Sequence, residues 1–497
     1  MPDAPTRIIR VGDNAWQSVR SGNLALLVDG ENYYQRLEEV LTLARQTIWI
    51  VGWDFNPEIR LRPADPASPQ LGPLLRSLVD ANPALEVRIL AWGMGQIYSG
   101  KTTRFFRKME WSSHPRIHLK FDFKHPIRAS HHQKIVCVDD VMAFAGGIDL
   151  TARRWDDRTH AIDNPLRVCN GKSYEPVHDM QTMVCGAAAR MIGDVARRRW
   201  RWATGEIFEP VDVPAQPWPE DLAETLSDGE IAIARTEPQH AGRKSHRETL
   251  KLTHDALKAA RHQIYIEAQY LAAFDVATIL AARLREPAGP EVVILVTRSS
   301  HGFLEKLMMG RNRDRLIRLL KRADRYDRLR VMFAVVPDGK GGEQEVIVHS
   351  KLIVIDDTFI RIGSSNLNNR SKGVDTECDL AFETTSPTER RKIALFRNDL
   401  LAEHLDADPK AVDAAVTEGG SVVAVLDRFN IKLRGLRAFP VDAGEGETTA
   451  LFGTAIVDPK KPYWPLQKWR SGPMTLVRRL RLAISDRYRL WISERPR

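Results

Sequence analysis

The chain alternates between two kinds of hydrophobic pattern, and the alternation occurs twice. Residues 34–46, YQRLEEVLTLARQ, place apolar side chains at helical spacing and lead into the short apolar run IWIVGW at 48–53. The same order appears at 247–263, RETLKLTHDALKAARHQ, followed by IYIEAQY at 264–270. Further apolar runs lie at 86–92 and 291–297. Continuous apolar runs are typical of strands covered on both faces by helices, so the sequence predicts an α/β fold with central sheets flanked by helices.

The repetition extends over a large unit. The stretches HHQKIVCVDD at 131–140 and HSKLIVIDD at 349–357 both contain the pattern H-x-K-x-x-x-x-D, with four apolar residues between Lys and Asp. Upstream, the segments 43–50 and 259–266 align at an offset of 216 residues. One register held over such a length predicts an internal duplication. The matched positions, at an offset of 217 residues, are His132 with His349, Lys134 with Lys351, Asp139 with Asp356, Asp140 with Asp357 and Gly146 with Gly363.

The stretch 209–221, EPVDVPAQPWPED, is rich in proline and is the natural linker between the two copies. We therefore expect an N-terminal repeat at 1–212, a C-terminal repeat at 213–440 and a separate tail at 441–497.

The positive charge of the chain is concentrated in that tail. The formal net charge is +9, and residues 461–497 carry ten Lys or Arg against two Asp or Glu. The nearly neutral remainder argues against a body-wide basic surface for nucleic acid but leaves a local basic groove open. Residues 475–491, TLVRRLRLAISDRYRLW, separate apolar residues from arginines around a helix. We expect a basic amphipathic helix that either contacts an anionic membrane surface or docks its apolar face on the body.

Other features bear on location and partners. No apolar run approaches the roughly eighteen residues that a membrane span needs, and the first twenty residues lack the apolar core of a secretory signal. We expect a cytoplasmic or peripheral membrane protein, and a monomer without an obligate protein partner because both motifs lie in one chain. The cysteines have no C-x-x-C spacing, which argues against zinc and fits free thiols; they are Cys137, Cys169, Cys185 and Cys378.

The repeated motif carries the candidate chemistry. Residues two apart on an extended backbone point the same way, so the His and the Lys project from one face. An imidazole beside a fixed ammonium pairs a nucleophile or acid with an oxyanion clamp, which suits a phosphate. After the next strand come GGID at 146–149 and GSSN at 363–366, where glycine permits close backbone approach and the last residue is a short polar group. The copies therefore favour a phosphodiester site with paired histidines.

Other interpretations of the motif are weaker. A single copy would be an ordinary solvated strand entrance, but two copies in one register reverse that preference. A metal site would need a second ligand where the motif has Lys. A serine nucleophile would need a G-x-S-x-G elbow, which the chain lacks.

The two stretches and their surroundings resemble the signature repeats of the phospholipase D superfamily. The resemblance rests on HHQKIVCVDD and AFAGGIDLTARRWDDRTH in the first copy and on HSKLIVIDD, IGSSNLNNRS and DTE in the second, and it covers roughly residues 24–400. The long GGIDLTARRWD form is most similar to the branch that acts on phospholipids. The resemblance to the superfamily implies two repeats about a pseudo-twofold axis, with His132 and His349 at one phosphate. It also implies that the reaction needs neither a metal nor a cofactor. It further implies that His132 attacks to form a phosphohistidine, that His349 is the acid, and that Lys134 and Lys351 stabilise the phosphate oxygens.

Each imidazole needs a group that orients it, and a carboxylate on the other ring nitrogen is the usual solution. Glu377 in DTECD and Asp179 in VHDMQ have comparable places in their repeats. We expect a crossed arrangement, with Glu377 supporting His132 and Asp179 supporting His349. Surface positions for both acids are the alternative.

Asp139 and Asp356 complete the catalytic motif, and we expect them to fix the turn after the strand. The chain departs from the family pattern at Ala268, where lipid-acting members usually have Asn. It is also asymmetric, because Asp149 stands where the second copy has Asn366.

Aromatic residues follow several strands and could form a wall for a lipid, although packing is the default role of each; they are Trp53, Trp92, Trp155 and Tyr270. The candidate substrate-binding residues are Asp149, Asn366, Gly147, Ser364, Trp53 and Tyr270.

Two classes of function remain. The first is a phospholipase or phosphatidyltransferase acting on glycerophospholipids, as cardiolipin synthases of this superfamily do. The second is a nuclease or another phosphodiesterase of the same superfamily. A membrane-binding scaffold without activity is disfavoured because neither motif is degraded. The neutral body and basic tail favour the lipid.

Overall fold

The computed structural model describes most of the chain before the basic tail. The described residues are 7–20, 22–95, 110–222, 225–299, 303–451 and 458–462. Residues up to Pro462 form one compact unit. The amphipathic helix expected at 475–491 lies outside the described residues.

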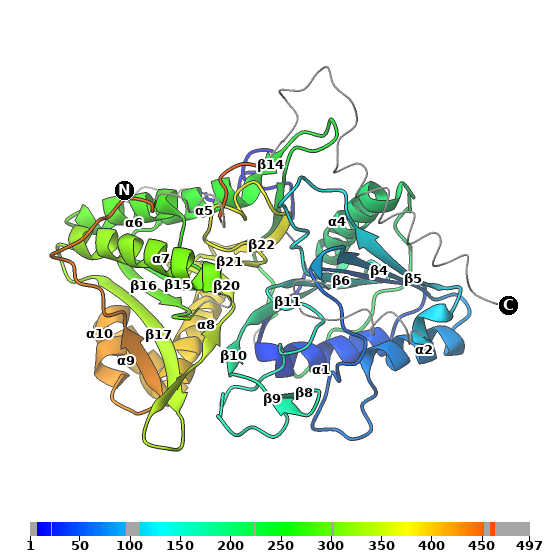
Figure 1. The fold of residues 1–497 in the computed structure, drawn as a ribbon, viewed down its shortest axis with the longest axis horizontal. Helices are drawn as coiled ribbons and strands as arrows, with labels where there is room; N and C mark the ends of the chain where they lie inside the picture. The colour runs from blue at the N-terminus through cyan, green and yellow to red at the C-terminus, as the bar shows by residue number, and fades with distance from the viewer. Residues whose placement is uncertain are drawn as a thin grey trace. The chain divides into compact units, whose positions relative to one another are not determined.

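The first half of this unit is built on an eight-stranded sheet. In order across the sheet, the strands are β12 (Thr225–Leu226), β2 (Leu24–Val28), β11 (Met180–Cys185), β7 (Met142–Gly146), β6 (Ile135–Val138), β3 (Thr47–Gly52), β4 (Glu86–Trp92) and β5 (Ile117–Asp122). Figure 1 shows the helices on its two faces: α1 (Asp29–Thr42) and α2 (Leu71–Ala81) on one, α4 (Gly186–Thr204) on the other.

The second half is built on an eleven-stranded sheet. Its main path is β1 (Gln17–Val19), β13 (Glu230–Glu237), β22 (Glu377–Glu383), β21 (Phe359–Gly363), β20 (Lys351–Ile355), β15 (Gln263–Ala268), β16 (Glu291–Val296), β17 (Leu329–Pro337) and β18 (Glu343–Glu345). Two strands pair off this path, β14 (His246–Arg247) with β13 and β23 (Gly435–Ala438) with β17. The covering helices are α5 (Glu248–Ala259), α6 (Phe274–Arg285) and α7 (Phe303–Ala323) on one face, and α8 (Pro387–Leu405), α9 (Pro409–Gly419) and α10 (Val422–Phe429) on the other (Figure 1).

The two sheets repeat one strand order. The run β2-β11-β7-β6-β3-β4-β5 corresponds strand by strand to β13-β22-β21-β20-β15-β16-β17. The pairing directions also agree, because β3–β4–β5 and β15–β16–β17 are parallel while β6 and β20 run antiparallel to β3 and β15. The predicted α/β class with two sheet-based repeats is therefore confirmed.

Each sheet also includes a strand from the other part of the chain. β1, near the start of the chain, pairs with β13 of the second sheet, and β12, which follows the linker, pairs with β2 of the first. Short strands β10 (Val177–His178) and β19 (Ile347–Val348), one from each half, pair in parallel. A hydrophobic cluster contains side chains of both halves, including Trp49, Trp200, Tyr265 and Leu400. The boundary expected near residue 212 stays a prediction.

Among the helices that the structure describes, none combines the length and apolar character that crossing a membrane requires.

Candidate active site

Two histidine–carboxylate pairs lie where the halves meet, and each pair takes one residue from each half. Nδ1 of His132 lies 2.9 Å from Oε2 of Glu377, and Nδ1 of His349 lies 2.6 Å from Oδ2 of Asp179. The structure thus brings together the crossed pairs expected from the sequence. Because each carboxylate binds at Nδ1, the other ring nitrogen, Nε2, is the one left to meet a substrate.

Backbone hydrogen bonds between the halves position both pairs. Beside the β10–β19 pairing, the N–H of His349 donates to the carbonyl oxygen of His178 at 2.7 Å. On the other side of the site, the N–H of His132 donates to the carbonyl oxygen of Thr376 at 3.1 Å. In each case the next residue after the carbonyl is the carboxylate that binds the same histidine. The pairs are therefore fixed by main chain as well as by side chains.

The two motif lysines have different surroundings. Lys134 Nζ forms an ion pair with Asp149 Oδ2 at 2.8 Å. Lys351 Nζ lies 3.1 Å from Nδ1 of His349 and donates to the carbonyl oxygen of the same residue. The position equivalent to Asp149 holds the neutral Asn366, whose Oδ1 is buried without a hydrogen-bond partner among the described residues. The second lysine therefore has no carboxylate partner at that position.

Burial shifts the titration of several of these groups. It lowers the pKa of Lys351 to about 7, because an ammonium loses hydration there. Burial and then repulsion from Asp375 raise the pKa of Glu377 to about 8. Burial, followed by the charge of the neighbouring motif lysine, lowers the pKa of both His132 and His349 well below the ordinary range. The imidazoles are thus neutral at rest, which keeps a lone pair available for attack on phosphorus.

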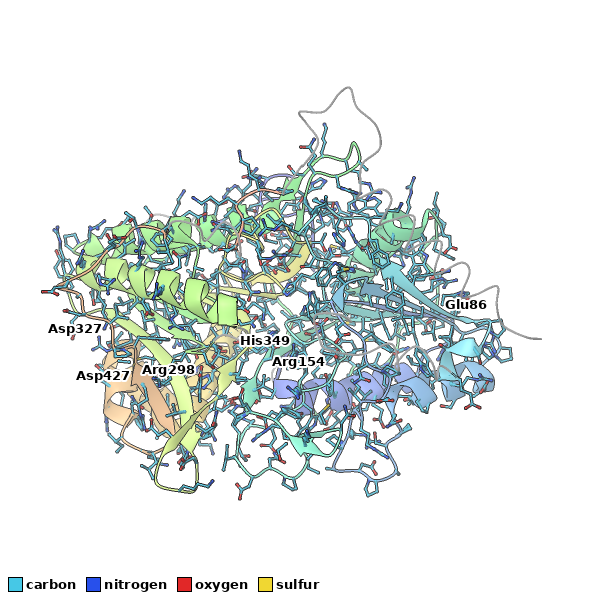
Figure 2. The ribbon with its side chains drawn as sticks, viewed as in Figure 1. Glu86, Arg154, Arg298, Asp327, His349 and Asp427 are labelled. Atoms are coloured by element: carbon cyan, nitrogen blue, oxygen red, sulfur yellow. The ribbon has the colours of Figure 1, made fainter. Side chains whose placement is uncertain are left out.

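Arg154 is a further cation at this site that the sequence analysis did not single out. Figure 2 shows it beside His349. After burial, its charge is among the causes that lower the pKa of His349 and Lys351. One arginine within LTARRWDDR gives no local signal that would separate it from its neighbours.

Gly147 and Ser364 occupy equivalent positions and both lie against the carboxylates. A Cβ at Gly147 would overlap Oδ1 of Asp179, so only glycine lets this carboxylate approach. Ser364 Oγ donates to Oε2 of Glu377 at 2.5 Å and accepts from the N–H of Cys378 at 3.1 Å. The sequence predicts that both residues face the substrate. In the structure, both instead contact the carboxylates that orient the histidines.

Asp139 and Asp356 lie at the far ends of their strands from the histidines. Asp139 accepts hydrogen bonds from the backbone N–H groups of residues 45–47 at 2.6–2.7 Å. Asp356 accepts from those of residues 261–263 at 2.7–2.9 Å. Both have positive φ, 53° and 51°, which Asp tolerates better than most residues. Their contacts fix the turn before β3 or β15 and do not extend to the histidine pairs.

The aromatic candidates divide into two groups. Trp53 and Tyr270 are half-buried, and Trp53 packs against Trp92 with ring centroids 5.6 Å apart. The backbone N–H of Trp53 also donates to Asp149 Oδ1 at 2.8 Å, so the main chain at this residue contacts the carboxylate that pairs with Lys134. Trp155 is buried in the hydrophobic cluster beneath α1, where it packs in the core.

A duplicated α/β unit with one His-x-Lys motif from each half defines a two-repeat phosphodiesterase. The family model described as "Cardiolipin synthase, PLD-like domain" matches residues 254–398. The chain belongs to the phospholipase D superfamily.

Individual relatives are distant. Phospholipase D A of Dictyostelium discoideum is 22% identical over 77% of this chain, which spans 34% of that protein. Phospholipase D alpha 4 of Arabidopsis thaliana is 23% identical over 86% of this chain, which spans 69% of that protein. Among solved structures, the phosphatidylserine synthase of Haemophilus influenzae is similar in fold, with a TM-score of 0.54, 13% identity, and coverage of 83% of this chain and 97% of that one.

Proposed function

We propose that the chain cleaves or transfers the phosphatidyl group of glycerophospholipids through a covalent phosphohistidine. The observation that carries the proposal is the crossed pair of dyads, His132 with Glu377 and His349 with Asp179. Two imidazoles, each oriented by a carboxylate and open at Nε2, suit two successive displacements at one phosphorus. No metal is needed in these steps.

The first displacement joins Nε2 of one histidine to phosphorus and breaks the bond from phosphorus to the headgroup oxygen. The second histidine gives its proton to the departing alkoxide. In the next displacement the same residue removes a proton from water or an alcohol, whose oxygen attacks phosphorus and releases the first histidine. Lys134, Lys351 and Arg154 stabilise the negative oxygens throughout. Binding of the phosphate also favours the charged form of Lys351.

The resemblance to the family assigns the attack to His132. One observation favours the opposite order. With a pKa of about 8, Glu377 retains its proton at neutral pH and shares it with Nδ1 of His132. The remaining proton of that neutral imidazole then lies on Nε2, which makes His132 a donor and gives the attack to His349. Mapping the peptide that carries the phosphatidyl group after an acid-free quench of the reaction decides between the two orders.

Three observations support lipid as the substrate. The body of the chain is nearly neutral, whereas residues 461–497 carry ten basic residues against two acidic ones. Such a tail would draw the enzyme to an anionic membrane surface. The relatives matched over most of this chain have names of phospholipases D, and the similar fold is that of a phosphatidylserine synthase. Nucleic acid is the second candidate substrate, because the paired histidines act on the phosphate and not on what it carries.

The experiment is a product assay on the purified full chain. Vesicles of phosphatidylcholine with phosphatidylserine are supplied with and without free glycerol, and single-stranded DNA is supplied in parallel. The proposal predicts phosphatidic acid, or a phosphatidyl-alcohol when glycerol is present, and the ratio of the two separates hydrolysis from transfer. The variant His349→Asn is the control for contaminating activity. Cleaved DNA with intact lipid would contradict the proposed substrate and retain the mechanism.

A further inference from the structure

A second cluster of polar side chains lies directly behind the histidine pairs. Asp29, His160, His178 and Glu403 are all buried, with side chains no more than 1% exposed. Three come from the first half and Glu403 comes from α8 of the second. One ligand atom from each residue lies within 4.8 Å of every other. The cluster is separate from the phosphate site, since none of the four is among the residues assigned to catalysis.

The separations within the cluster fit a tetrahedron. His160 Nε2 and His178 Nδ1 each lie 3.2 Å from Glu403 Oε1. His178 Nδ1 lies 3.1 Å from Asp29 Oδ1, and His160 Nε2 lies 3.6 Å from Asp29 Oδ2. Bonds of about 2.0–2.1 Å to a tetrahedral zinc ion place neighbouring ligand atoms about 3.3–3.4 Å apart. The four observed separations bracket that value, although they involve both oxygens of Asp29, of which one would bind the ion.

The second shell has the pattern found around metal-binding histidines. The ring nitrogen of His160 that faces away from the cluster, Nδ1, lies 3.1 Å from Asp156 Oδ2. The outward nitrogen of His178, Nε2, lies 2.9 Å from Glu267 Oε2. A carboxylate on the outer nitrogen fixes the tautomer of a metal-binding histidine and raises its basicity. The geometry therefore orients both imidazoles toward one point.

Two of the inward atoms lack hydrogen-bond partners among the described residues. These are Asp29 Oδ2 and His178 Nδ1, and both residues are fully buried. His178 Nδ1 is close to two carboxylate oxygens, yet neither contact is aligned as a hydrogen bond. Buried polar atoms are nearly always satisfied. An ion at the centre of the cluster would satisfy both.

If the two histidines of the cluster are neutral, the negative charges around it also outnumber the positive ones. Four carboxylates are present, on Asp29, Asp156, Glu267 and Glu403. Two arginines pair with them: Arg158 Nε lies 2.8 Å from Glu403 Oε2, and Arg167 lies 2.9 Å from Asp156 Oδ1. Arg158 also pairs with Asp399 at 2.9 Å, so at least two negative charges remain, and one divalent cation, or a proton on each imidazole, neutralises two of them.

We propose that Asp29, His160, His178 and Glu403 bind one Zn²⁺ ion with a structural role. The ion joins α8 of the second half to the first half. It also supports the active site, because the backbone N–H of Asp29 donates to the carbonyl oxygen of Asp179 at 2.8 Å. The ion lies behind the dyad of Asp179 and His349 and takes no part in phosphoryl transfer.

The test measures metal in the untagged full-length chain, purified without chelator. We expect about one equivalent of zinc by mass spectrometry. After removal of the metal under mild denaturant, Co²⁺ should bind and give the visible absorption bands of a tetrahedral site. Thermal stability should fall on removal and return when Zn²⁺ is added. Less than a tenth of an equivalent of zinc, with no Co²⁺ uptake, would overturn the proposal and leave protonated histidines as the neutralising charges.

Variants locate the ion. His160→Gln should bind less than a fifth of an equivalent, whereas His118→Gln should bind as the wild type does. His118 is a matched control because it also pairs with a carboxylate, Glu86 Oε2 at 2.7 Å, but is part-exposed and outside the cluster. Full zinc content in folded His160→Gln would place the ion elsewhere and contradict the assignment. If His160→Gln fails to fold, the wild-type metal content and Co²⁺ spectrum decide.

Discussion

Oε2 of Glu377, in the second half of the chain, lies 2.9 Å from Nδ1 of His132, in the first. The reciprocal contact, Asp179 of the first half with His349 of the second, spans 2.6 Å. Neither half therefore contains a complete dyad, and the site exists only when both sheets are packed together. The duplication has produced one site from two incomplete ones.

Replacing either histidine with asparagine should abolish turnover while preserving the fold. Removal of a positioned nucleophile or proton donor should lower kcat by on the order of 10³-fold or more. The change is small and polar, so the melting temperature should stay near that of the wild type. Steady-state assays on His132→Asn and His349→Asn measure the first effect and calorimetry the second. Either variant with near wild-type activity would contradict the mechanism with two histidines.

The motif aspartates should behave differently from the histidines. Asp139→Ala removes the acceptor for three backbone N–H groups at 2.6–2.7 Å and should lower the free energy of unfolding by about 2–4 kcal/mol. Below the melting temperature, kcat of the folded enzyme should stay within about twofold of wild type, because this carboxylate does not contact the dyads. Urea unfolding and a kcat measurement on the same preparation check both points. A large loss of kcat with unchanged stability would show that Asp139 has a catalytic role.

Asp149→Asn should expose the asymmetry between the two lysines. In the wild type, Lys134 is 3% exposed and paired with Asp149 at 2.8 Å. The substitution leaves a buried ammonium without its counter-charge, which costs about 3–5 kcal/mol when a buried pair loses one partner. The expected result is a matching fall in the free energy of unfolding. The control is Asp65→Asn, whose partner Arg62 is 43% exposed, and for which little change is expected. Equal effects of the two substitutions would contradict this account of Asp149.

Activity should fall as the pH rises above neutrality. The pKa of Lys351 is about 7 and that of Glu377 about 8, so both groups lose a proton between pH 6 and 9. Loss of the first removes a positive charge from the phosphate site, and loss of the second removes the proton shared with His132. A profile of kcat/KM, which reports the free enzyme, should therefore have its descending limb in this range. A profile flat to pH 9 would show that neither group controls catalysis.

The raised pKa of Glu377 also predicts that the stability of the protein falls as the pH rises. The pKa of Glu377 is raised from 4.5 to about 8, so the folded state binds more protons than the unfolded state between these values. Stability contributed by this group is present below the unfolded pKa and is lost as the pH rises through the folded one. Glu377→Gln should therefore flatten the decline in melting temperature between pH 5 and 8. An unchanged slope would contradict the raised pKa.

Much of the fold could be predicted from the sequence because its strands are continuous apolar runs. The predicted strands at 86–92 and 291–297 correspond to β4 and β16. The predicted helices at 34–46 and 247–263 extend too far, since α1 ends at Thr42 and α5 at Ala259. The reason is tertiary: Asp139 and Asp356 bind the backbone N–H groups just beyond each helix and turn the chain into the next strand.

The site residues that could be predicted from the sequence are those that occur in both copies of the duplication. The histidines and lysines recur at one offset of 217 residues, so each copy supported the other, and the dyad carboxylates have comparable places in the two repeats. Residues without a counterpart gave no such signal. Arg154 is one arginine among several, and the buried cluster draws single residues from positions 29, 160, 178 and 403. Only packing brings these four together, because no spacing along the chain relates them.

The stereochemistry of transfer at phosphorus tests the central claim most directly. A phosphatidylcholine analogue in which sulfur replaces one non-bridging oxygen, so that phosphorus is a stereocentre of known configuration, would be supplied with an alcohol acceptor. The configuration at phosphorus in the phosphatidyl-alcohol product would be assigned by phosphorus NMR. Two displacements through a phosphohistidine each invert the phosphorus, so the account predicts net retention. Net inversion would mean a single direct displacement and would contradict a covalent intermediate on either His132 or His349.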